Sequence, residues 1–356
     1  MKAPSKWPAL IFLGLFAPWR AVGAEKIVAR FFYDEKGQIS RQERDTNGDG
    51  RMDRWIYYRD GRIERVEQDE NFDGKPDVFL FYQAEKLVRQ ELSTKRDGKI
   101  DRRLYFESEK ISRAEEDSNG DGRVDSFSYY EKGQLARKEI DRKHTGKIDL
   151  WGYYREGHLI RQEEDRNGDG KADRFLHFQQ GQIVRREEDS RGLGRIDLIE
   201  LYLGGRVSRR FLDSQGNGRF DTLQLFKEGR LVLEEKDTDG DGYSDLRTFF
   251  EDERALRREA DTNRDRRVDV WVTYRDGERV LQEEDQNLNG KIDARYLFKD
   301  GRVVEKAKVA EVEPATPPSA FFSIEDELRR ALVGASPEAS ERGLHNRWLV
   351  PGSEKR

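Results

Sequence analysis

Residues 45–68 read DTNGDGRMDRWIYYRDGRIERVEQ, and residues 117–140 read DSNGDGRVDSFSYYEKGQLARKEI. Aligning the chain on these stretches gives eleven consecutive 24-residue repeats without an insertion, which begin at residues 45, 69, 93, 117, 141, 165, 189, 213, 237, 261 and 285. The ninth residue of every repeat is aspartate, and the fourteenth is always aromatic. This self-similarity predicts a repeat protein in which each unit packs on its neighbours.

The composition agrees with a thin array rather than one large core. Of the 356 residues, 39% are charged and only 35% are hydrophobic, so little apolar area is available for burial. The aromatic content of 11% is nevertheless too high for a disordered chain of this charge. The chain has no cysteine, so disulfides do not stabilise it.

Each repeat contains two predicted β-strands. Positions 10–14 hold runs such as RWIYY, VFLFY and VWVTY, whose aromatic and β-branched residues favour strands. A turn follows, often with glycine at position 17, as in Asp60-Gly61, and positions 18–24 then alternate. We therefore expect an all-β fold, an elongated antiparallel β-hairpin array. The turn could contain two or three residues, and an open meander and a superhelix both fit the pattern.

The segments on either side of the repeats differ from them in character. Residues 1–24 resemble a secretory signal, with Lys2 and Lys6 before a short apolar run and Val22-Gly23-Ala24 before a cleavage point. The alternative is a buried N-terminal strand. The apolar run is too short to span a bilayer, so we expect no transmembrane segment and an exported protein, in the periplasm, on the cell surface or outside the cell. Residues 25–44 form an N-terminal half repeat, and the eleven full repeats occupy 45–308.

The C-terminal region is predicted to be a linker and a tail. Residues 309–322 form a proline-rich linker, and residues 323–356 form the tail. A short helix is expected from Ser323, as N-cap, to Val333. The apolar stripe of Ile324, Leu328 and Leu332 makes this segment either a docking peptide or a frayed tail. The adjoining Phe321 and Phe322 favour docking, and residues 320–356 are therefore our candidate contact for an unknown protein or cell-surface partner.

Most repeats open with an acidic loop close to the form D-x-N-x-D-G-x-x-D. Oxygen side chains at loop positions 1, 3 and 5, a carbonyl at 7, and a glycine at 6 for the sharp turn are the arrangement that hard cations require. An all-oxygen ligand set favours calcium over zinc. The alternative is that Asp, Asn and Gly form turns without metal. The candidate calcium ligands of repeats 1, 2, 4, 6 and 9, and of the nearly complete repeats 10 and 11, are Asp45, Asn47, Asp49, Asp53, Asp69, Asn71, Asp73, Asp77, Asp117, Asn119, Asp121, Asp125, Asp165, Asn167, Asp169, Asp173, Asp237, Asp239, Asp241, Asp245, Asp261, Asn263, Asp265, Asp269, Asp285, Asn287, Asn289 and Asp293.

These nine-residue loops resemble the DxDxDGxxD calcium loops of thrombospondin type 3 repeats and dockerins. They are most similar to the β-hairpin calcium loops of integrin-type propeller blades. The resemblance covers the loop and its strand–loop–strand setting, not the 24-residue unit. It implies calcium binding and no particular partner. An EF-hand is excluded because loop position 12 lies inside a strand, as at Ile56.

Repeats 3, 5 and 7 are expected to bind no metal. They carry Lys95, Lys143 and Arg191 at loop position 3. Such a cation could neutralise the retained Asp101, Asp149 or Asp197, or the loops could simply have decayed. Repeat 8 fits the calcium pattern only in part.

Arginine at position 21 recurs in eight repeats, and glutamate is common at position 23. The arginines could line a surface for an acidic glycan, but cross-strand Arg–Glu pairing is the favoured interpretation. The aromatic row at position 14 could stack on sugars, but a buried stripe is favoured.

Acidic residues outnumber basic ones, 72 to 67, which argues against a nucleic-acid ligand. No catalytic constellation recurs, so we expect no enzyme. The favoured function is an exported, calcium-binding scaffold or adhesion-type protein, and the alternative is a glycan-binding module with purely structural calcium.

Overall fold

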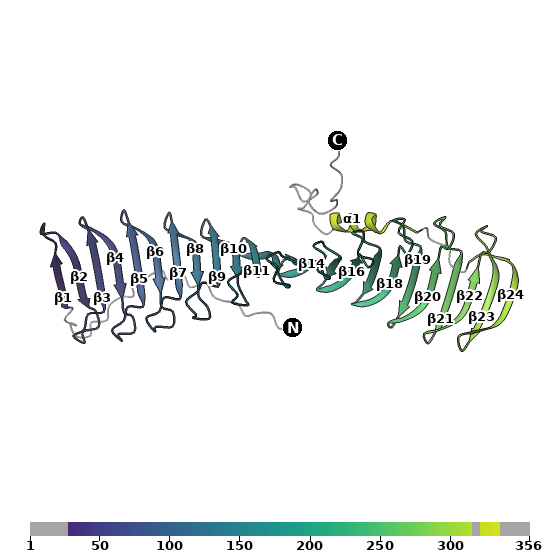
Figure 1. Ribbon diagram of the computed structural model, residues 1–356, viewed down its shortest axis with the longest axis horizontal. Helices are drawn as coiled ribbons and strands as arrows, with labels where there is room; N and C mark the ends of the chain where they lie inside the picture. The colour runs from purple at the N-terminus through teal and green to yellow at the C-terminus, as the bar shows by residue number, and fades with distance from the viewer. Residues whose placement is uncertain (1–27, 315–320, 335–356) are drawn as a thin grey trace, which may run out of the picture. The chain divides into compact units, whose positions relative to one another are not determined.

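The computed structural model describes residues 28–314 and 321–334. The predicted signal at 1–24 lies outside the described residues, as do parts of the predicted linker and tail. The chain divides into two bodies, residues 1–109 and residues 110–356. Each described body is built from antiparallel strands that pair with their sequence neighbours, which confirms the predicted all-β hairpin array (Figure 1).

The N-terminal body contains seven strands in sequential antiparallel order. They are β1 (Val28–Tyr33), β2 (Ile39–Asp45), β3 (Arg54–Arg59), β4 (Arg62–Gln68), β5 (Val78–Gln83), β6 (Lys86–Leu92) and β7 (Arg102–Glu107). The predicted half repeat therefore forms the hairpin β1–β2.

The C-terminal body contains seventeen strands and the single helix of the described residues. They are β8 (Lys110–Glu116), β9 (Ser126–Glu131), β10 (Gln134–Ile140), β11 (Leu150–Arg155), β12 (His158–Glu164), β13 (Arg174–Gln179), β14 (Gln182–Glu188), β15 (Leu198–Leu203), β16 (Arg206–Leu212), β17 (Thr222–Lys227), β18 (Arg230–Lys236), β19 (Leu246–Glu251), β20 (Arg254–Ala260), β21 (Val270–Arg275), β22 (Glu278–Glu284), β23 (Ile292–Lys299), β24 (Arg302–Val312) and α1 (Ile324–Gly334). Strand β24 continues to Val312, beyond Lys308 where the repeat pattern ends.

The hairpin turn has two residues, which settles the alternative that the sequence left open. In the first repeat Tyr58 pairs with Ile63 and Arg59 pairs with Arg62, so Asp60 and Gly61 form the turn. Both turn residues have positive φ, 50° and 76°, as this tight hairpin geometry requires. The register shifts between Tyr57 and Tyr58, and position 20 is the extra residue of a β-bulge.

This register assigns the repeat positions to two faces of a single-layer sheet. Directly paired residues share a face, and successive residues alternate between faces. Face A carries positions 10, 12, 14, 19, 22 and 24, as shown by the pairs Tyr58–Ile63 and Ile56–Val66. Face B carries positions 11, 13, 21 and 23, as shown by the pairs Tyr57–Arg65 and Trp55–Glu67.

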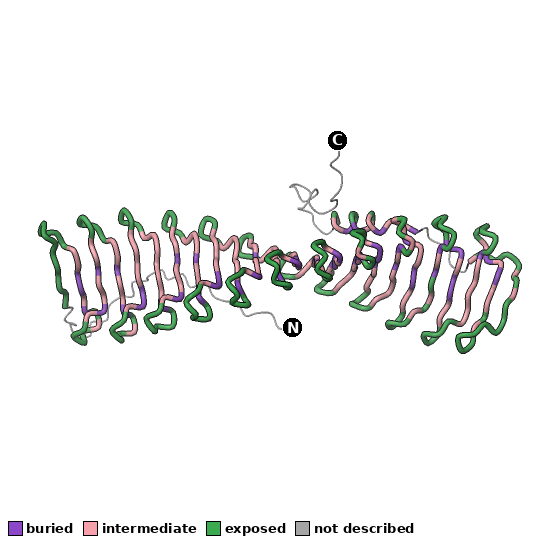
Figure 2. The backbone as a smooth tube through the Cα atoms, viewed as in Figure 1, coloured by how far each residue is buried: buried purple, intermediate pink, exposed green. Residues whose placement is uncertain are grey.

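Position 14 forms a half-buried row on face A rather than a fully buried stripe. Every position-14 residue from Tyr58 to Phe298 is partly exposed. In repeat 5 the ring of Tyr154 lies over Gly152, where an added Cβ would be 3.2 Å from a ring carbon. The rings pack along their own sheet because no second layer covers this part of it. Buried residues are consequently scattered along the strands (Figure 2).

A charged network crosses face A in the middle of the C-terminal body. Glu188 and Glu200 are only 2% and 3% exposed. Arg174 and Arg186 contact Glu188, while Arg186 and Arg210 contact Glu200. Burial raises the pKa of Glu200, but hydrogen bonds from Tyr202 and Arg210 outweigh it and lower the pKa below its ordinary value. Every buried carboxylate in this network has a cationic partner, as burial in an apolar setting requires.

Helix α1 packs on face B, where the repeat pattern changes from charged to apolar. Position 23 of repeat 7 is Phe211 instead of glutamate, and Phe211 is completely buried. Together with Ile199, Leu201 and Leu223 it forms a cluster that the helix covers with Ile324, Leu328 and Ala331. The apolar stripe that the sequence offered to a partner is therefore occupied by the chain's own sheet.

Polar contacts fix the position of the helix. Ser323 caps its N-terminus, with the Asp326 N–H donating to the Ser323 hydroxyl at 3.3 Å. Arg209 Nη1 lies 2.8 Å from Glu327 Oε1. Before the helix, Phe321 packs with Val268, Trp271 and Ile292, so the segment crosses face B between two apolar clusters. Among the described residues no helix is long and apolar enough to cross a membrane.

Leu328→Ala is expected to loosen the helix. Leu328 is 1% exposed, and truncating a buried leucine costs about 2–5 kcal/mol. Amide hydrogen exchange in residues 324–334 should therefore accelerate, as should exchange in β15–β17. Val333→Ala is the matched control because Val333 is 67% exposed. Equal exchange rates in the two variants would contradict the docking described above.

Candidate metal centre

Two aspartates organise each complete acidic loop, and in repeats 1, 2, 4 and 6 both of them are buried. In repeat 1 the Asp45 carboxylate, 1% exposed, accepts hydrogen bonds from the Gly48 and Gly50 N–H groups at 2.6 and 2.9 Å. The Asp53 carboxylate, 5% exposed, accepts from the Thr46 N–H at 2.8 Å. Loop positions 1 and 9 therefore satisfy backbone donors that the loop would otherwise leave unpaired.

Loop positions 3 and 5 continue the same pattern on the outside. The Asn47 side-chain oxygen accepts from the Asp49 N–H at 3.0 Å, and the Asp49 carboxylate accepts from the Arg51 N–H at 2.7 Å. Position 5 is exposed in all seven candidate loops. Hydrogen bonding to the Arg51 N–H lowers the pKa of Asp49, with a smaller contribution from Asn47. The loops thus form the hydrogen-bonded turns expected of Asp, Asn and Gly.

Three predicted carboxylate ligands come together in repeat 9. Ligand atoms of Asp237, Asp239 and Asp245 all lie within 4.8 Å of one another. Asp241, at position 5, is not part of this group. In the described chain this is the one group of three acidic or histidine side chains at such distances. The convergence therefore involves positions 1, 3 and 9, and position 3 is asparagine in the other six candidate loops.

Unpaired oxygens at position 9 test whether the other loops suit a cation. The Oδ1 atoms of Asp77, Asp125 and Asp173 are buried without a hydrogen-bond partner. These residues are 2%, 4% and 8% exposed. Repeats 2 and 6 have Glu70 and Arg166 at position 2, where repeat 1 has a threonine whose hydroxyl bonds the equivalent oxygen. Burying a carboxylate oxygen without a hydrogen-bond partner costs free energy. Calcium prefers carboxylate oxygens as ligands, so these loops fit the ion.

Raised carboxyl pKa values in two loops also favour a bound cation. Burial raises the pKa of Asp237, and the adjacent Asp239 carboxylate adds to the shift against opposing backbone hydrogen bonds. Burial also raises the pKa of Asp269, with Asp261 contributing. Crowded carboxylates of this kind are relieved by a bound cation.

Two arginines of repeat 10 reach into the loop of repeat 9, a contact that sequence reasoning missed. Arg264 Nε lies 2.8 Å from Asp239 Oδ2, and Arg266 stacks on Tyr243 at 3.5 Å from the ring centre. Both arginines have positive φ, 68° and 70°, at positions where most repeats have glycine. The missing glycine of repeat 10 was therefore a signal of contact with the preceding loop.

In repeats 5 and 7 arginine side chains pair with the retained position-9 aspartates. Arg191 Nε lies 2.7 Å from Asp197 Oδ2, as proposed for a cation at position 3. In repeat 5 the pairing residue is instead Arg142, at position 2, whose Nε lies 3.3 Å from Asp149 Oδ2. In repeat 3, within the described structure, Lys95 makes no ion pair with Asp101.

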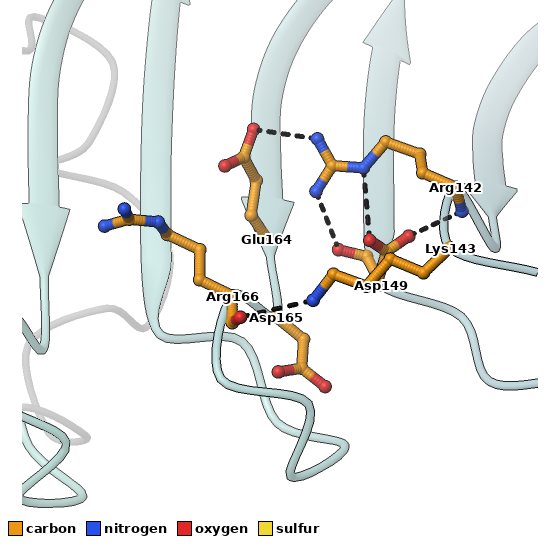
Figure 3. A pocket seen from close by; sticks show the side chains of 6 residues that line it. All are labelled: Arg142, Lys143, Asp149, Glu164, Asp165 and Arg166. Carbon is orange, nitrogen blue, oxygen red and sulfur yellow. Dashed lines mark hydrogen bonds and ion pairs between the residues drawn. The ribbon is translucent and has the colours of Figure 1, made fainter. Parts of the chain in front are cut away.

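A shallow pocket between the loops of repeats 5 and 6 is lined by three cations and three carboxylates (Figure 3). Arg142 bridges Asp149 and Glu164, the latter at 3.6 Å. Lys143 instead donates to the Arg166 carbonyl of the next loop at 3.2 Å. Arg142 is thus paired with two of the three pocket carboxylates, and the Lys143 contact joins neighbouring loops.

The arginine row on face B is also paired, but not across strands as expected. Arg65 and Glu67 lie on one strand, two residues apart on the same face, and form an ion pair at 3.0 Å. The residue opposite Arg65 is Tyr57, and the guanidinium lies 4.2 Å from its ring centre. Ion pairs of this kind recur at Arg41, Arg89, Arg113, Arg137, Arg161, Arg185 and Arg257. Cross-strand pairs form where position 11 is arginine, as between Arg247 and Glu235.

Comparisons with known proteins give no family for this chain. No family model and no curated protein matches it. Structural matches include the crystal structure titled TcdB2-TccC3-Cdc42, at 10% identity and a TM-score of 0.13, covering 76% of this chain and 23% of that chain. Another is titled TcdB2-TccC3-TEV, at 10% identity and a TM-score of 0.15, with 76% and 21% covered. The chain spans less than a quarter of these two proteins' length.

Arg191→Gln is expected to destabilise repeat 7 in a pH-dependent manner. Burial raises the pKa of Asp197, but Arg191 and Ser190 lower it below its ordinary value. The stabilisation is therefore complete above the ordinary aspartate pKa of about 3.9 and is lost as the pH falls through the lowered value. Arg191 is 39% exposed and Asp197 only 2%, so the variant leaves a buried carboxylate without its cation and should have a lower free energy of unfolding at neutral pH.

Urea denaturation of wild type and variant at neutral and strongly acidic pH measures this effect. Lys95→Gln is the control because that lysine makes no pair with its aspartate. A difference between wild type and Arg191→Gln that is the same at both pH values would mean that the ion pair is not its source.

Proposed function

We propose that this chain is an exported, non-enzymatic scaffold or adhesion-type protein whose acidic loops bind calcium. The observation that carries the proposal is the unpaired, buried Oδ1 of Asp77, Asp125 and Asp173 in three loops of the predicted calcium pattern. The clustered carboxylates of Asp237, Asp239 and Asp245 support it in a fourth loop. Asp, Asn and main-chain oxygens at these positions would hold the ion.

Calcium in this arrangement has a structural role. The position-1 and position-9 carboxylates already position the loop backbone, and calcium would neutralise their charge and link the loop to the strands that it joins. Because the repeats form a single-layer sheet with scattered buried residues, loop stability contributes a large share of the stability of each hairpin. Binding free energy would therefore add directly to folding free energy.

The glycan-binding alternative has weaker support on face B. The guanidinium groups that would contact an anionic polymer already pair with glutamates, such as Glu67 and Glu91, and stack on aromatic rings. Binding an acidic glycan there would require breaking these pairs. The half-buried aromatic row on face A likewise packs on its own sheet. A scaffold role agrees better with both faces.

Removing calcium is expected to destabilise the protein. Saturating calcium stabilises the folded state by mass action at each site, so excess chelator should lower the melting temperature by about ten degrees or more. Circular dichroism or calorimetry with and without calcium measures this, and magnesium is the control for charge screening. An identical melting temperature in calcium and in chelator would overturn the calcium proposal.

Asp173→Asn separates metal binding from turn formation. The asparagine oxygen can still accept the Arg166 and Asn167 N–H groups that Asp173 binds at 2.9 and 3.1 Å. The variant loses the carboxylate charge and the unpaired oxygen. We expect one calcium fewer per chain by isothermal titration, with little change of melting temperature in chelator.

Thr145→Ala in repeat 5, whose loop is expected to bind no metal, is the matched control. It should bind as many calcium ions as the wild type. A loss of one ion in both variants, or in neither, would show that the division into binding and non-binding loops is wrong.

A further inference from the structure

Two strands of the described chain each have an edge without a strand partner. Strand β1 pairs with β2 alone, and β24 pairs with β23 alone. Within the described residues their outer edges make no strand pairing, and an edge of this kind is a template for pairing with another chain. This feature is separate from the acidic loops and from calcium.

Strand β1 lacks the charges that normally protect an edge. Its sequence is VARFFY, with Arg30 as its sole charged residue. Phe31, Phe32 and Tyr33 are 49%, 38% and 62% exposed. Strand β24 does carry charges, at Arg302, Glu305, Lys306, Lys308 and Glu311, but it also exposes Val303 at 51% and Val304 at 61%. Large exposed apolar side chains on an open edge indicate a contact surface.

The repeat register shows how the two edges fit. Between consecutive repeats, positions 21, 22, 23 and 24 pair with positions 13, 12, 11 and 10 of the next, as from Arg41–Tyr57 to Arg44–Arg54. Tyr33 pairs with Ile39 as Tyr58 pairs with Ile63, so β1 supplies positions 10–14. Strand β24 supplies positions 18–24. A second copy's β1 placed beside β24 would therefore continue the alternation of strand directions and the repeat phase.

The side chains in this register are compatible. Continuing the pairing places Lys306 opposite Phe31 of the next copy, and Ala307 opposite Arg30. Lys306 already lies 5.0 Å from the ring centre of Tyr296, so it can hold a second ring on the same face. The small Ala307 leaves room for Arg30, and Glu305 lies diagonal to that arginine on face B.

We propose that copies of this chain associate head to tail, with β24 of one copy pairing antiparallel with β1 of the next. The contact is heterologous, because it joins two different surfaces. Each added copy therefore presents a new free β24 or β1, and the product is an open series of oligomers unless the rotation closes it into a ring.

Paired cysteines test the register directly, since the chain has no cysteine of its own. In the full-length protein, Phe31→Cys with Lys306→Cys places the two sulfurs on opposite residues of the seam, within disulfide reach. Mild oxidation should give a ladder of covalent oligomers in non-reducing electrophoresis. Arg30→Cys with Lys306→Cys is the control, because residue 30 faces the other side of the sheet.

A charge exchange tests the seam without covalent capture. Phe31→Lys would face Lys306 of the neighbouring copy and should weaken association by about tenfold, which corresponds to about 1.4 kcal/mol. Adding Lys306→Glu should restore it. Analytical ultracentrifugation over a concentration series measures both, and circular dichroism verifies that the variants fold.

Three results would overturn the proposal. The first is a wild type that stays monomeric over the whole concentration series. The second is association that Phe31→Lys leaves unchanged. The third is equal cross-linking of the two cysteine pairs. Association abolished by chelator but unaffected by these variants would place the contact at the loops instead.

Discussion

Hydrogen bonding of loop N–H groups to two buried carboxylates is the constraint on which the rest of the fold depends. Each loop must return the chain from one strand to the next and satisfy several main-chain donors in a few residues. Asp45 and Asp53 do this in repeat 1, and aspartate recurs at the ninth position of every repeat. With the loops fixed in this way, the strands between them keep one register, and the 24-residue period becomes a structural period.

The single-layer sheet explains how this chain folds with so few hydrophobic residues. Over much of face B an arginine contacts both a same-strand glutamate and a cross-strand ring, as Arg65 contacts Glu67 and Tyr57. The aliphatic part of the arginine covers the sheet while its charge stays paired. Where the pattern lapses, at Phe211, the surface becomes apolar and helix α1 covers it.

Neighbouring loops are coupled by contacts that run forward or backward by one repeat. Lys143 donates to the carbonyl of Arg166, and Arg264 pairs with Asp239 of the preceding loop. In repeats 5 and 7 an arginine pairs with the position-9 carboxylate, which is a candidate metal ligand in other repeats. We propose that calcium neutralises this carboxylate in the candidate loops, as arginine does in repeats 5 and 7.

The sequence by itself determined the strands, the loops and their period, because turn chemistry at Asp and Gly and the aromatic runs are local properties. It also indicated the C-terminal helix through its cap at Ser323.

The sequence could not determine which positions share a face, because the bulge at position 20 depends on hairpin pairing. The Arg–Glu pairs lie along strands because positions 21 and 23 share a face of one strand, while the residue opposite the arginine is an aromatic one in most repeats, as Tyr57 is opposite Arg65. In repeat 9 the loop carboxylates at positions 1, 3 and 9, rather than 5, approach one another because backbone N–H groups direct these side chains. The apolar stripe of the helix could have met a partner or the sheet, and only the tertiary structure decided for the sheet, since Ile199, Phe211 and Leu223 become neighbours only once β15, β16 and β17 have paired.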